Sequence, residues 1–244
     1  MTPLVDAHAH IGASDQAEEI KAAHIVTIYN STGADDLEAT RKVVTSSRPF
    51  GAFFAGLHPN NPHRDLDFLR WAQEHADELD GVGEIGLDRT NDTVENRSLF
   101  LKQLALAERL GKPVCIHSRG KVEQVLEDLS SYSVKGVLLH WFQGDLRQLE
   151  ACVMKGIYVS FGPPLLYSKK LRRLLAVTPI EKLLLETDSP VRYASCFEDR
   201  ESTPLLVASV YLAAAFVLRI PVEELETSLF KNALNLLGRS AAQR

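Results

Sequence analysis

Long apolar runs are missing from the chain. No stretch approaches the about 18–20 consecutive apolar residues that a helix needs to cross a bilayer. The first residues, Met-Thr-Pro-Leu-Val-Asp, contain no basic region followed by an apolar stretch, so we expect no secretory signal. The sequence therefore predicts a protein that has no membrane segment.

Cysteine is scarce, with three residues that lie far apart and form no Cys-x-x-Cys pair: Cys115, Cys152 and Cys196. An odd number without paired spacing argues against a disulfide framework and fits a reducing compartment. We accordingly expect a cytoplasmic location.

Positive charge is not in surplus either. The chain has 27 Lys and Arg against 32 Asp and Glu, a formal charge of −5, whereas a broad charge-driven nucleic-acid binder is usually basic. Bound divalent ions would add positive charge that this tally omits. An anionic substrate captured at metal ions therefore remains open.

What the chain does have is a series of strand-length apolar runs, most of them followed by helical periodicity and a cluster of turn-forming residues. Near-continuous apolar runs are typical of parallel strands covered on both faces. We predict one α/β domain over residues 1–244, a (β/α)8 TIM barrel, with a doubly wound open sheet as the alternative. The runs are Leu4–His8, Ile25–Tyr29, Ala52–Leu57, Gly81–Leu87, Pro113–His117, Gly136–Trp141, Ile157–Phe161 and Lys182–Thr187.

Three helical segments are readable between and after these runs. Arg97–Leu110 repeats apolar residues every three to four positions before a Gly and a Pro end it. The segment between the first two strands is short, Asp15–Ala23. Thr203–Leu237 reads as two helices separated at Pro221.

Histidines and carboxylates gather at the predicted carboxyl ends of the strands. His8 and His10 are two residues apart, so they point to the same side and are spaced to share one ion. Strand ends converge at the mouth of a barrel, where barrel enzymes hold their active sites. A buried ionisable group costs free energy unless it is paired, so a whole rim of them predicts a metal site. The candidate ligands are His8, His10, Glu84, His117, His140 and Asp188.

This mixture of imidazoles and carboxylates suits Zn, Mn, Fe or Ni, and carboxylate with water also admits Mg. Cys115 lies two residues before His117 and is expected to fill the core one layer deeper, outside the ligand set. Asp6, two before His8, is expected to face inward as a hydrogen-bond partner near the ligands.

Other polar and aromatic residues have weaker patterns. Arg119 should lean over the mouth, where it can grip a phosphate; a surface salt bridge is the alternative. Trp141 should point into the core between strand and helices, with stacking on an unpaired base as the alternative. His24, His63 and His75 have no motif around them and are expected on the surface or in loops.

Six motifs, in order along essentially the whole chain, resemble those of the TatD-type metal-dependent deoxyribonucleases. They are Val-Asp-Ala-His-Ala-His (5–10), Gly-Leu-His-Pro (56–59), Gly-Glu-Ile-Gly-Leu-Asp (83–88), Ile-His-Ser-Arg (116–119), His-Trp-Phe-Gln-Gly (140–144) and Glu-Thr-Asp-Ser-Pro (186–190). The resemblance implies a (β/α)8 fold of the amidohydrolase superfamily.

The resemblance also implies a ligand arrangement. His8, His10 and Asp188 would hold one ion, His117 and His140 the other, and Glu84 would bridge the two. We expect two divalent ions, Mg, Mn or Zn, which can clamp the attacking and leaving oxygens of a phosphodiester. Asp188 would be both ligand and proton acceptor for the attacking water, so Glu84 and Asp188 are the expected catalytic pair.

At the substrate rim, the resemblance gives His58 a substrate contact, with a loop histidine bonded to backbone as the alternative. Arg89 stands where the family usually has an aromatic residue, and Trp141 and Gln143 also depart from its pattern. These departures alter the rim without removing any proposed ligand.

We therefore predict a phosphodiesterase that acts on DNA, as an exonuclease on single strands or free ends, without an obligate protein partner. The second hypothesis is a hydrolase of a small ester, lactone, amide or phosphotriester, because the same metal pair can activate water for attack on carbonyl carbon or on phosphorus. A non-catalytic metal-binding scaffold is the third.

Overall fold

The computed structural model describes residues 2–12, 17–61 and 67–239. Its strands form one sheet of eight parallel strands in chain order, each hydrogen-bonded to the next. A doubly wound sheet would reverse its strand order, so the (β/α)8 prediction is confirmed and the open-sheet alternative is wrong. The strands are β1 Leu4–Ala9, β2 Ile25–Asn30, β3 Gly51–Ala55, β4 Gly81–Gly86, β5 Val114–His117, β6 Val137–Leu139, β7 Tyr158–Phe161 and β8 Leu183–Leu185.

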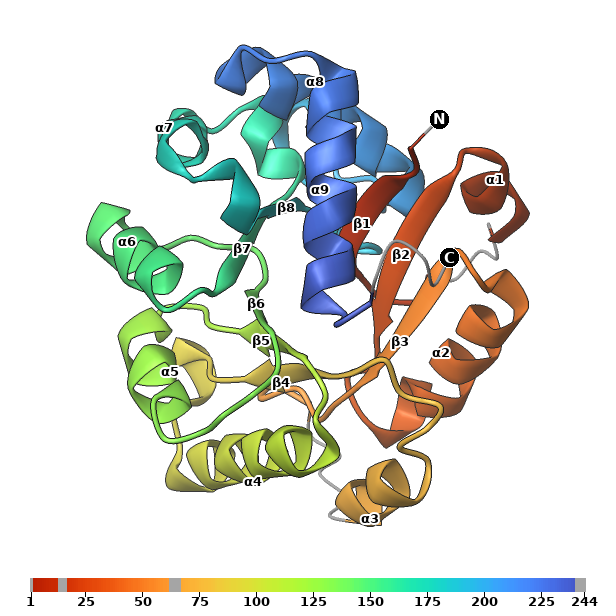
Figure 1. Cartoon of the computed structure of the whole chain (residues 1–244), viewed down its shortest axis with the longest axis vertical. Helices are drawn as coiled ribbons and strands as arrows, with labels where there is room; N and C mark the ends of the chain where they lie inside the picture. Colours follow the sequence, from red (N-terminus) through yellow and green to blue (C-terminus); the bar gives the residue numbers. More distant parts are fainter. Residues whose placement is uncertain (1, 13–16, 62–66, 240–244) are drawn as a thin grey trace.

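The sheet curls until its first and last strands meet (Figure 1). Backbone hydrogen bonds join them just beyond the end of β8: Asp188 N donates to His8 O over 2.9 Å, and His10 N donates to Ser189 O over 2.7 Å. Three of these four residues are candidate metal ligands, and the fourth, Ser189, belongs to the same motif as Asp188. The closure of the barrel and the placement of the candidate ligands thus depend on the same backbone contacts.

Helices surround the strands in Figure 1 and follow the predicted alternation. The helix predicted at Arg97–Leu110 begins earlier, at Val94, because the Thr93 side chain accepts a hydrogen bond from Asn96 N and caps it. The last two helices are separated at Pro221, as predicted. The helices are α1 Ala17–Ala22, α2 Ala34–Ser47, α3 Asp67–Glu74, α4 Val94–Leu110, α5 Val122–Leu129, α6 Leu146–Met154, α7 Lys169–Val177, α8 Val207–Leu218 and α9 Val222–Leu236.

The last helix, α9, lies across one end of the barrel (Figure 1). Ala233 and Leu236 join the cluster of apolar side chains inside the barrel, together with residues from β1, β2, β3, β5, β6, β7 and β8. The Asn232 side chain donates to the carbonyl oxygens of Ile180 and Leu183, which fixes α9 at the amino end of β8. The amino end is thereby covered, and the carboxyl end, where the candidate ligands lie, stays open.

Within the described ranges, no single helix is long and apolar enough to cross a membrane. The segments Pro204–Leu218 and Val222–Leu236 pass the test of length and composition only as a pair, and they are bent by 110° relative to each other.

Gly86 brings β4 and β5 together directly beside the candidate site. It pairs with His117, has φ 144°, and a Cβ atom at this position would lie 2.0 Å from the carbonyl oxygen of His117. We expect Gly86→Ala to lower the free energy of unfolding by about 2–4 kcal/mol in a urea titration, since it combines backbone strain with crowding. Gly111→Ala is the control: Gly111 also has positive φ but open space around it, so about 1–2 kcal/mol is expected. Equal losses of unfolding free energy in the two variants would contradict a contribution from crowding at Gly86.

Candidate metal centre

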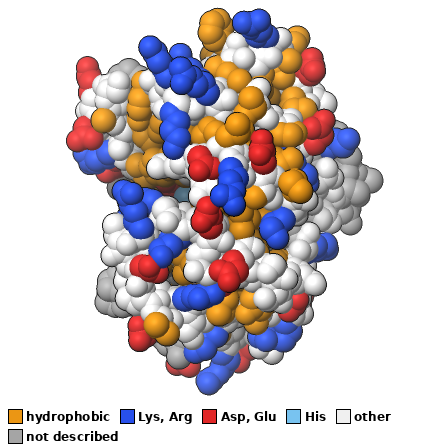
Figure 2. All heavy atoms as spheres, turned by 90° about the vertical axis from the view of Figure 1, so that its left-hand side faces the viewer, with side chains coloured by type: hydrophobic (Ala, Val, Ile, Leu, Met, Phe, Trp, Pro, Cys, Tyr) orange, Lys and Arg blue, Asp and Glu red, His pale blue; other side chains and the backbone are white. Residues whose placement is uncertain are grey.

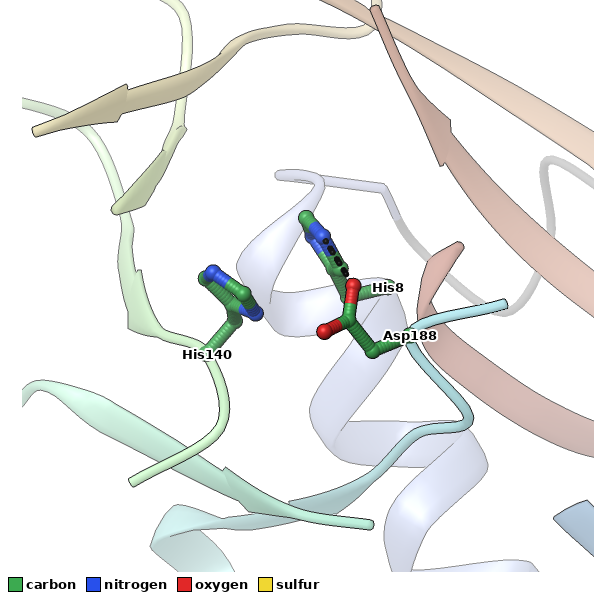
Figure 3. Close-up of side chains that lie close together, drawn as sticks. All are labelled: His8, His140 and Asp188. Carbon is green, nitrogen blue, oxygen red and sulfur yellow. Dashed lines mark ion pairs between the residues drawn. The ribbon is translucent and has the colours of Figure 1, made fainter. Parts of the chain in front are cut away.

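All six predicted ligands meet inside the open end of the barrel, although they come from five different strands or strand ends. Figure 3 shows three of them converging, from β1, from the segment after β6 and from the segment after β8. The six are His8 in β1 and His10 just after it, Glu84 in β4, His117 at the end of β5, His140 after β6 and Asp188 after β8.

Glu84 lies between two pairs of imidazoles and presents a different oxygen to each. Its Oε2 is 3.1 Å from His10 Nε2 and 3.5 Å from His8 Nε2. Its Oε1 is 2.7 Å from His140 Nε2 and 2.9 Å from His117 Nδ1. This is the arrangement that a carboxylate bridging two cations requires, with one oxygen for each.

Asp188 also lies close to the first of these pairs. Its Oδ1 lies 3.3 Å from His8 Nε2 and 3.5 Å from His10 Nε2. Asp188 is buried and has φ 49°, a conformation that is sparsely populated by residues other than glycine and that clusters at functional sites. The described residues thus form a compact cluster of imidazoles and carboxylates that fits divalent metal.

The outer ring nitrogens of the first pair have partners that direct the inner nitrogens to this cluster. His10 Nδ1 lies 2.8 Å from the carbonyl oxygen of Asn30, which can only accept, so Nδ1 keeps its proton when the ring is neutral and the Nε2 lone pair then faces the carboxylates. His8 Nδ1 lies 3.1 Å from Cys115 Sγ. Burial, together with the nearby carboxylates, raises the pKa of the Cys115 thiol, so it stays protonated among apolar neighbours.

His140 has a carboxylate behind it as well. Glu186 Oε1 lies 3.7 Å from His140 Nδ1, beyond hydrogen-bond distance, and neither atom has another hydrogen-bond partner among the described residues. Both side chains are buried, so a small shift of either would pair them. Glu186 lies in the Glu-Thr-Asp-Ser-Pro motif, but sequence reasoning assigned it no role.

His58 also reaches the cluster. Its Nε2 lies 3.3 Å from Glu84 Oε1, and it groups with Glu84 and His117 as a third set of donors that could hold an ion. Its Nδ1, however, accepts a hydrogen bond from Asn60 N over 3.1 Å. The neutral ring therefore carries its proton on Nε2, which makes His58 a hydrogen-bond donor towards the site.

Asp88 contacts the candidate ligand His117, and sequence reasoning gave it no role either. Its side chain is fully buried, and its Oδ2 lies 2.7 Å from His117 Nε2. It also accepts from Arg119 Nε (2.9 Å), Asn60 Nδ2 (2.9 Å), and the backbone and hydroxyl of Thr90 (both 2.8 Å). Burial raises the pKa of this carboxyl, but these hydrogen bonds outweigh it and lower the pKa below its usual range. The alternation from Glu84 through Gly86 was the available signal, since it places Asp88 on the same side.

Arg119 leans towards the mouth but has a partner there. Its Nε and Nη2 both contact Asp88 Oδ2, at 2.9 and 2.8 Å, and Nη2 lies 3.2 Å from the Thr90 hydroxyl. The side chain is 47% exposed. Arg119 therefore forms a salt bridge, as in the alternative, but its partner is a buried carboxylate at the site; the contact with a phosphate stays a prediction.

Asp6 is buried, as predicted, but its partners are mainly backbone. It accepts hydrogen bonds from the backbone and hydroxyl of Thr187 and, at 3.4 Å, from His8 N. Burial raises the pKa of its carboxyl well above the usual value. Asp6 thus ties the middle of β1 to the segment after β8, and its side chain contacts no side chain of a candidate ligand among the described residues.

The position of Trp141 differs from the one predicted from the sequence. The predicted core position is wrong: Trp141 is half-buried, lines the pocket at the mouth and contacts the ring of Tyr193 at 5.7 Å between centroids. Its φ of 42° breaks the strand alternation that had placed it on the helix side. His24 is exposed and His75 bonds to the Trp71 carbonyl oxygen, as expected for surface residues, whereas His63 lies outside the described residues.

The mouth of the barrel forms a pocket of about 740 Å³, with His10, Glu84, His117, His140 and Asp188 in its wall. Figure 2 shows one face of the molecule with a hollow in which a histidine is visible, and with Lys and Arg side chains beside it. A ligand in this pocket would meet the candidate ligands and a partly basic rim together.

Metal binding is expected to release protons. Burial lowers the pKa of His10, but its contacts with Asp188 and Glu84 outweigh this and raise the pKa to about 10. The pKa of His140 is likewise raised above its usual value. Both rings therefore carry a second proton at neutral pH without metal, and must lose that proton to bind an ion. Metal affinity should rise by up to about tenfold per pH unit for each displaced proton.

Calorimetric titration of metal into metal-free protein, at pH 7 in buffers of different ionisation enthalpy, measures this release. The carboxylates contribute no protons, because the histidines hold the pKa values of Glu84 and Asp188 below the usual range in spite of their burial. A binding enthalpy that is independent of the buffer would contradict the prediction.

Known proteins are similar to this chain in sequence and in fold. The family model described as TatD related DNase matches residues 5–238. The human protein named deoxyribonuclease TATDN3 is 28% identical, over 97% of this chain and 95% of that protein. The 3'-5' ssDNA/RNA exonuclease TatD of Edwardsiella piscicida is 33% identical over 56% of each chain. The crystal structure of YJJV, a TatD homologue from Escherichia coli K12, superposes with a TM-score of 0.88 at 26% identity, covering 97% of this chain and 98% of that one. Since the family model covers nearly the whole chain, this protein belongs to the TatD related DNase family.

Proposed function

We propose that this protein is a two-metal phosphodiesterase that cleaves DNA as an exonuclease, from the free end of a single strand. The observation that carries the proposal is the position of Glu84, which turns one oxygen to His8 and His10 and the other to His117 and His140. The names of the human and Edwardsiella relatives support nucleic acid as the substrate. We also propose that it acts in the cytoplasm, which the scarcity of cysteine fits, and that it needs no obligate protein partner.

The donor set supports two sites. His8, His10 and Asp188 would hold one ion, His117 and His140 the other, and Glu84 would bridge them. Imidazole with carboxylate suits Mn and Zn, and the carboxylates also admit Mg. When bound, such a pair lowers the pKa of a water molecule and stabilises the charge on the leaving oxygen of a phosphodiester.

The remaining roles belong to side chains of the mouth. Asp188 accepts the proton of the attacking water at its carboxylate, which is ionised at neutral pH because neighbouring imidazoles lower its pKa against the effect of burial. His58 donates from Nε2 to a phosphate oxygen. Arg119 contacts the phosphate with the guanidinium N–H groups that Asp88 leaves unpaired. The covered amino end makes the pocket a blind one, which favours a strand terminus over an intact duplex.

Asp88 orients His117 in this scheme. By accepting from Nε2 it keeps the proton there and leaves the Nδ1 lone pair facing Glu84. We expect Asp88→Asn to lower metal affinity and kcat/KM by about 10–100-fold, because the amide can present a donor to the same ring nitrogen. Competition with a chelating dye gives the affinity.

Asp92→Asn is the matched control for that experiment. Asp92 lies on the same loop and pairs with Lys121, with no contact to the histidines, so metal affinity should stay within about twofold. An Asp88→Asn protein that kept both its affinity and its activity would remove Asp88 from the scheme.

The test of the function is release of nucleotides from end-labelled single-stranded DNA, with Mg²⁺, Mn²⁺ or Zn²⁺, beside Glu84→Ala. Metal-dependent shortening from one end that the variant lacks is the expected result, and the position of the label gives the direction. If metal analysis shows filled sites and no strand is cut, the phosphodiesterase proposal fails, and esters, lactones and amides are the substrates to try.

A further inference from the structure

Three cationic side chains line the pocket, and they are not equally neutralised. They are Arg89, Arg119 and Lys170, whereas the acidic residues in the described wall of the pocket are Glu84 and Asp188. Arg119 is matched by the buried carboxylate of Asp88. The other two have no carboxylate partner among the described residues. In a chain with a net charge of −5, this is a local excess of positive charge.

Arg89 is held by its backbone and leaves its charge unpaired. It begins the short 3₁₀ turn Arg89–Asn91 directly after β4, and its backbone N donates to Arg119 O over 3.0 Å. Its aliphatic stem lies over Gly120, so closely that a Cβ atom there would be 2.8 Å from Arg89 Cδ. The side chain is exposed, and its guanidinium has no hydrogen bond or ion pair within the described ranges. The stem is thus packed while the charge faces the mouth.

Lys170 occupies an unfavourable place for a cation. It lies in the first turn of α7, which contains no acidic residue, and the positive end of a helix dipole repels a cation there. Its Nζ donates to the carbonyl oxygen of Gln143, in the loop after β6, over 2.9 Å. This contact holds the ammonium group at the wall of the pocket, where an anion would offset both its charge and the helix dipole.

We propose that Arg89 and Lys170 bind the backbone phosphates that flank the phosphodiester at the metal centre, and so select a nucleic-acid strand over a small diester. This inference rests on the proposed function and adds its substrate-selecting residues. Phosphates are recognised by such basic side chains independently of base sequence. The strand would lie along the β4 to β7 part of the rim, with the bond to be cleaved above Glu84.

The first test compares Arg89→Gln and Lys170→Gln with the wild type on a decathymidylate and on bis(p-nitrophenyl) phosphate, which has a single phosphate. Each substitution should raise KM for the decamer by about tenfold, and lower the ratio of kcat/KM between decamer and small diester by the same factor. The slope of log kcat/KM against log salt should fall by about 0.7 to 1 for each removed cation. Arg109→Gln, at the far end of α4, removes the same charge outside the pocket and should change none of these values.

Equal losses on both substrates, or no loss on either, would overturn the proposal. A second measurement neutralises the ligand instead of the protein, with a methylphosphonate at the linkage next to the cleaved bond. The wild type should lose about tenfold in kcat/KM, and the Arg89→Gln/Lys170→Gln protein less than about twofold, because the same contact is already absent. Losses that simply add would also overturn the proposal.

Failure of the proposed function would be separately visible. If the metal-loaded wild type cut no strand, the labelled decamer would survive, and its binding could be followed by fluorescence anisotropy. The subsite proposal then requires that both substitutions weaken binding and lower its salt slope by about 0.7 to 1 each. Unchanged binding would overturn it whatever the reaction.

Discussion

Glu84→Ala is expected to lose both metal ions and to lower kcat/KM by at least about 10⁴-fold. The substitution removes one oxygen from each of the two imidazole pairs, so neither site keeps its full set of donors. It also removes the carboxylate that helps to raise the pKa values of His10 and His140. Elemental analysis of the purified protein measures the metal, and circular dichroism shows whether the barrel has folded.

Glu181→Ala is the control, because Glu181 is exposed in the turn before β8, at the other end of the barrel. It should retain full metal content and activity. Glu84→Gln keeps the volume of the side chain while removing its charge, and should resemble the alanine variant. Two tightly bound ions in a folded Glu84→Ala protein would show that the carboxylate does not bridge.

Asp188→Asn is expected to lower kcat by about 10²–10⁴-fold while KM changes little. The amide oxygen can still face His8 and His10, but an amide accepts no proton from water at neutral pH. The limb of the pH–rate profile that belongs to this carboxylate should disappear. Metal content is measured alongside, so that loss of the proton acceptor is separated from loss of the ion; full activity with filled sites would exclude the proposed role.

The predictable part of this protein was the part that strand periodicity determines. The spacing of His8 and His10, and the apolar runs that contain Glu84, His117 and His140, were enough to predict the barrel and to gather its polar residues at one rim. Six strands, β3 to β8, are shorter than predicted, and the difference is largest for β6, which ends at Leu139, and β8, which ends at Leu185. The apolar runs of β6 and β8 continue past the last ladder hydrogen bond, so hydrophobicity alone overestimates their length.

The missed features depend on contacts between segments far apart in the chain. Asp88 was given no role because its hydrogen-bond partners come from the loops after β3 and β4 and from the end of β5. No local sequence pattern connects these segments. Trp141 was misplaced because its positive φ is set by the turn after β6. The amphipathic pattern of α9 predicts a helix, but not that it covers the end of the barrel.

Because α9 covers the amino end of the barrel, the pocket has a single opening, at the carboxyl end. Since α9 packs across the amino end, a strand cannot thread through the barrel, and whatever is cut off must leave by the way it came. In the proposed reaction each released nucleotide stands in the path of the shortened strand until it diffuses out. Product release would then limit the turnover rate, and free mononucleotide would compete with the incoming strand end for the opening of the pocket.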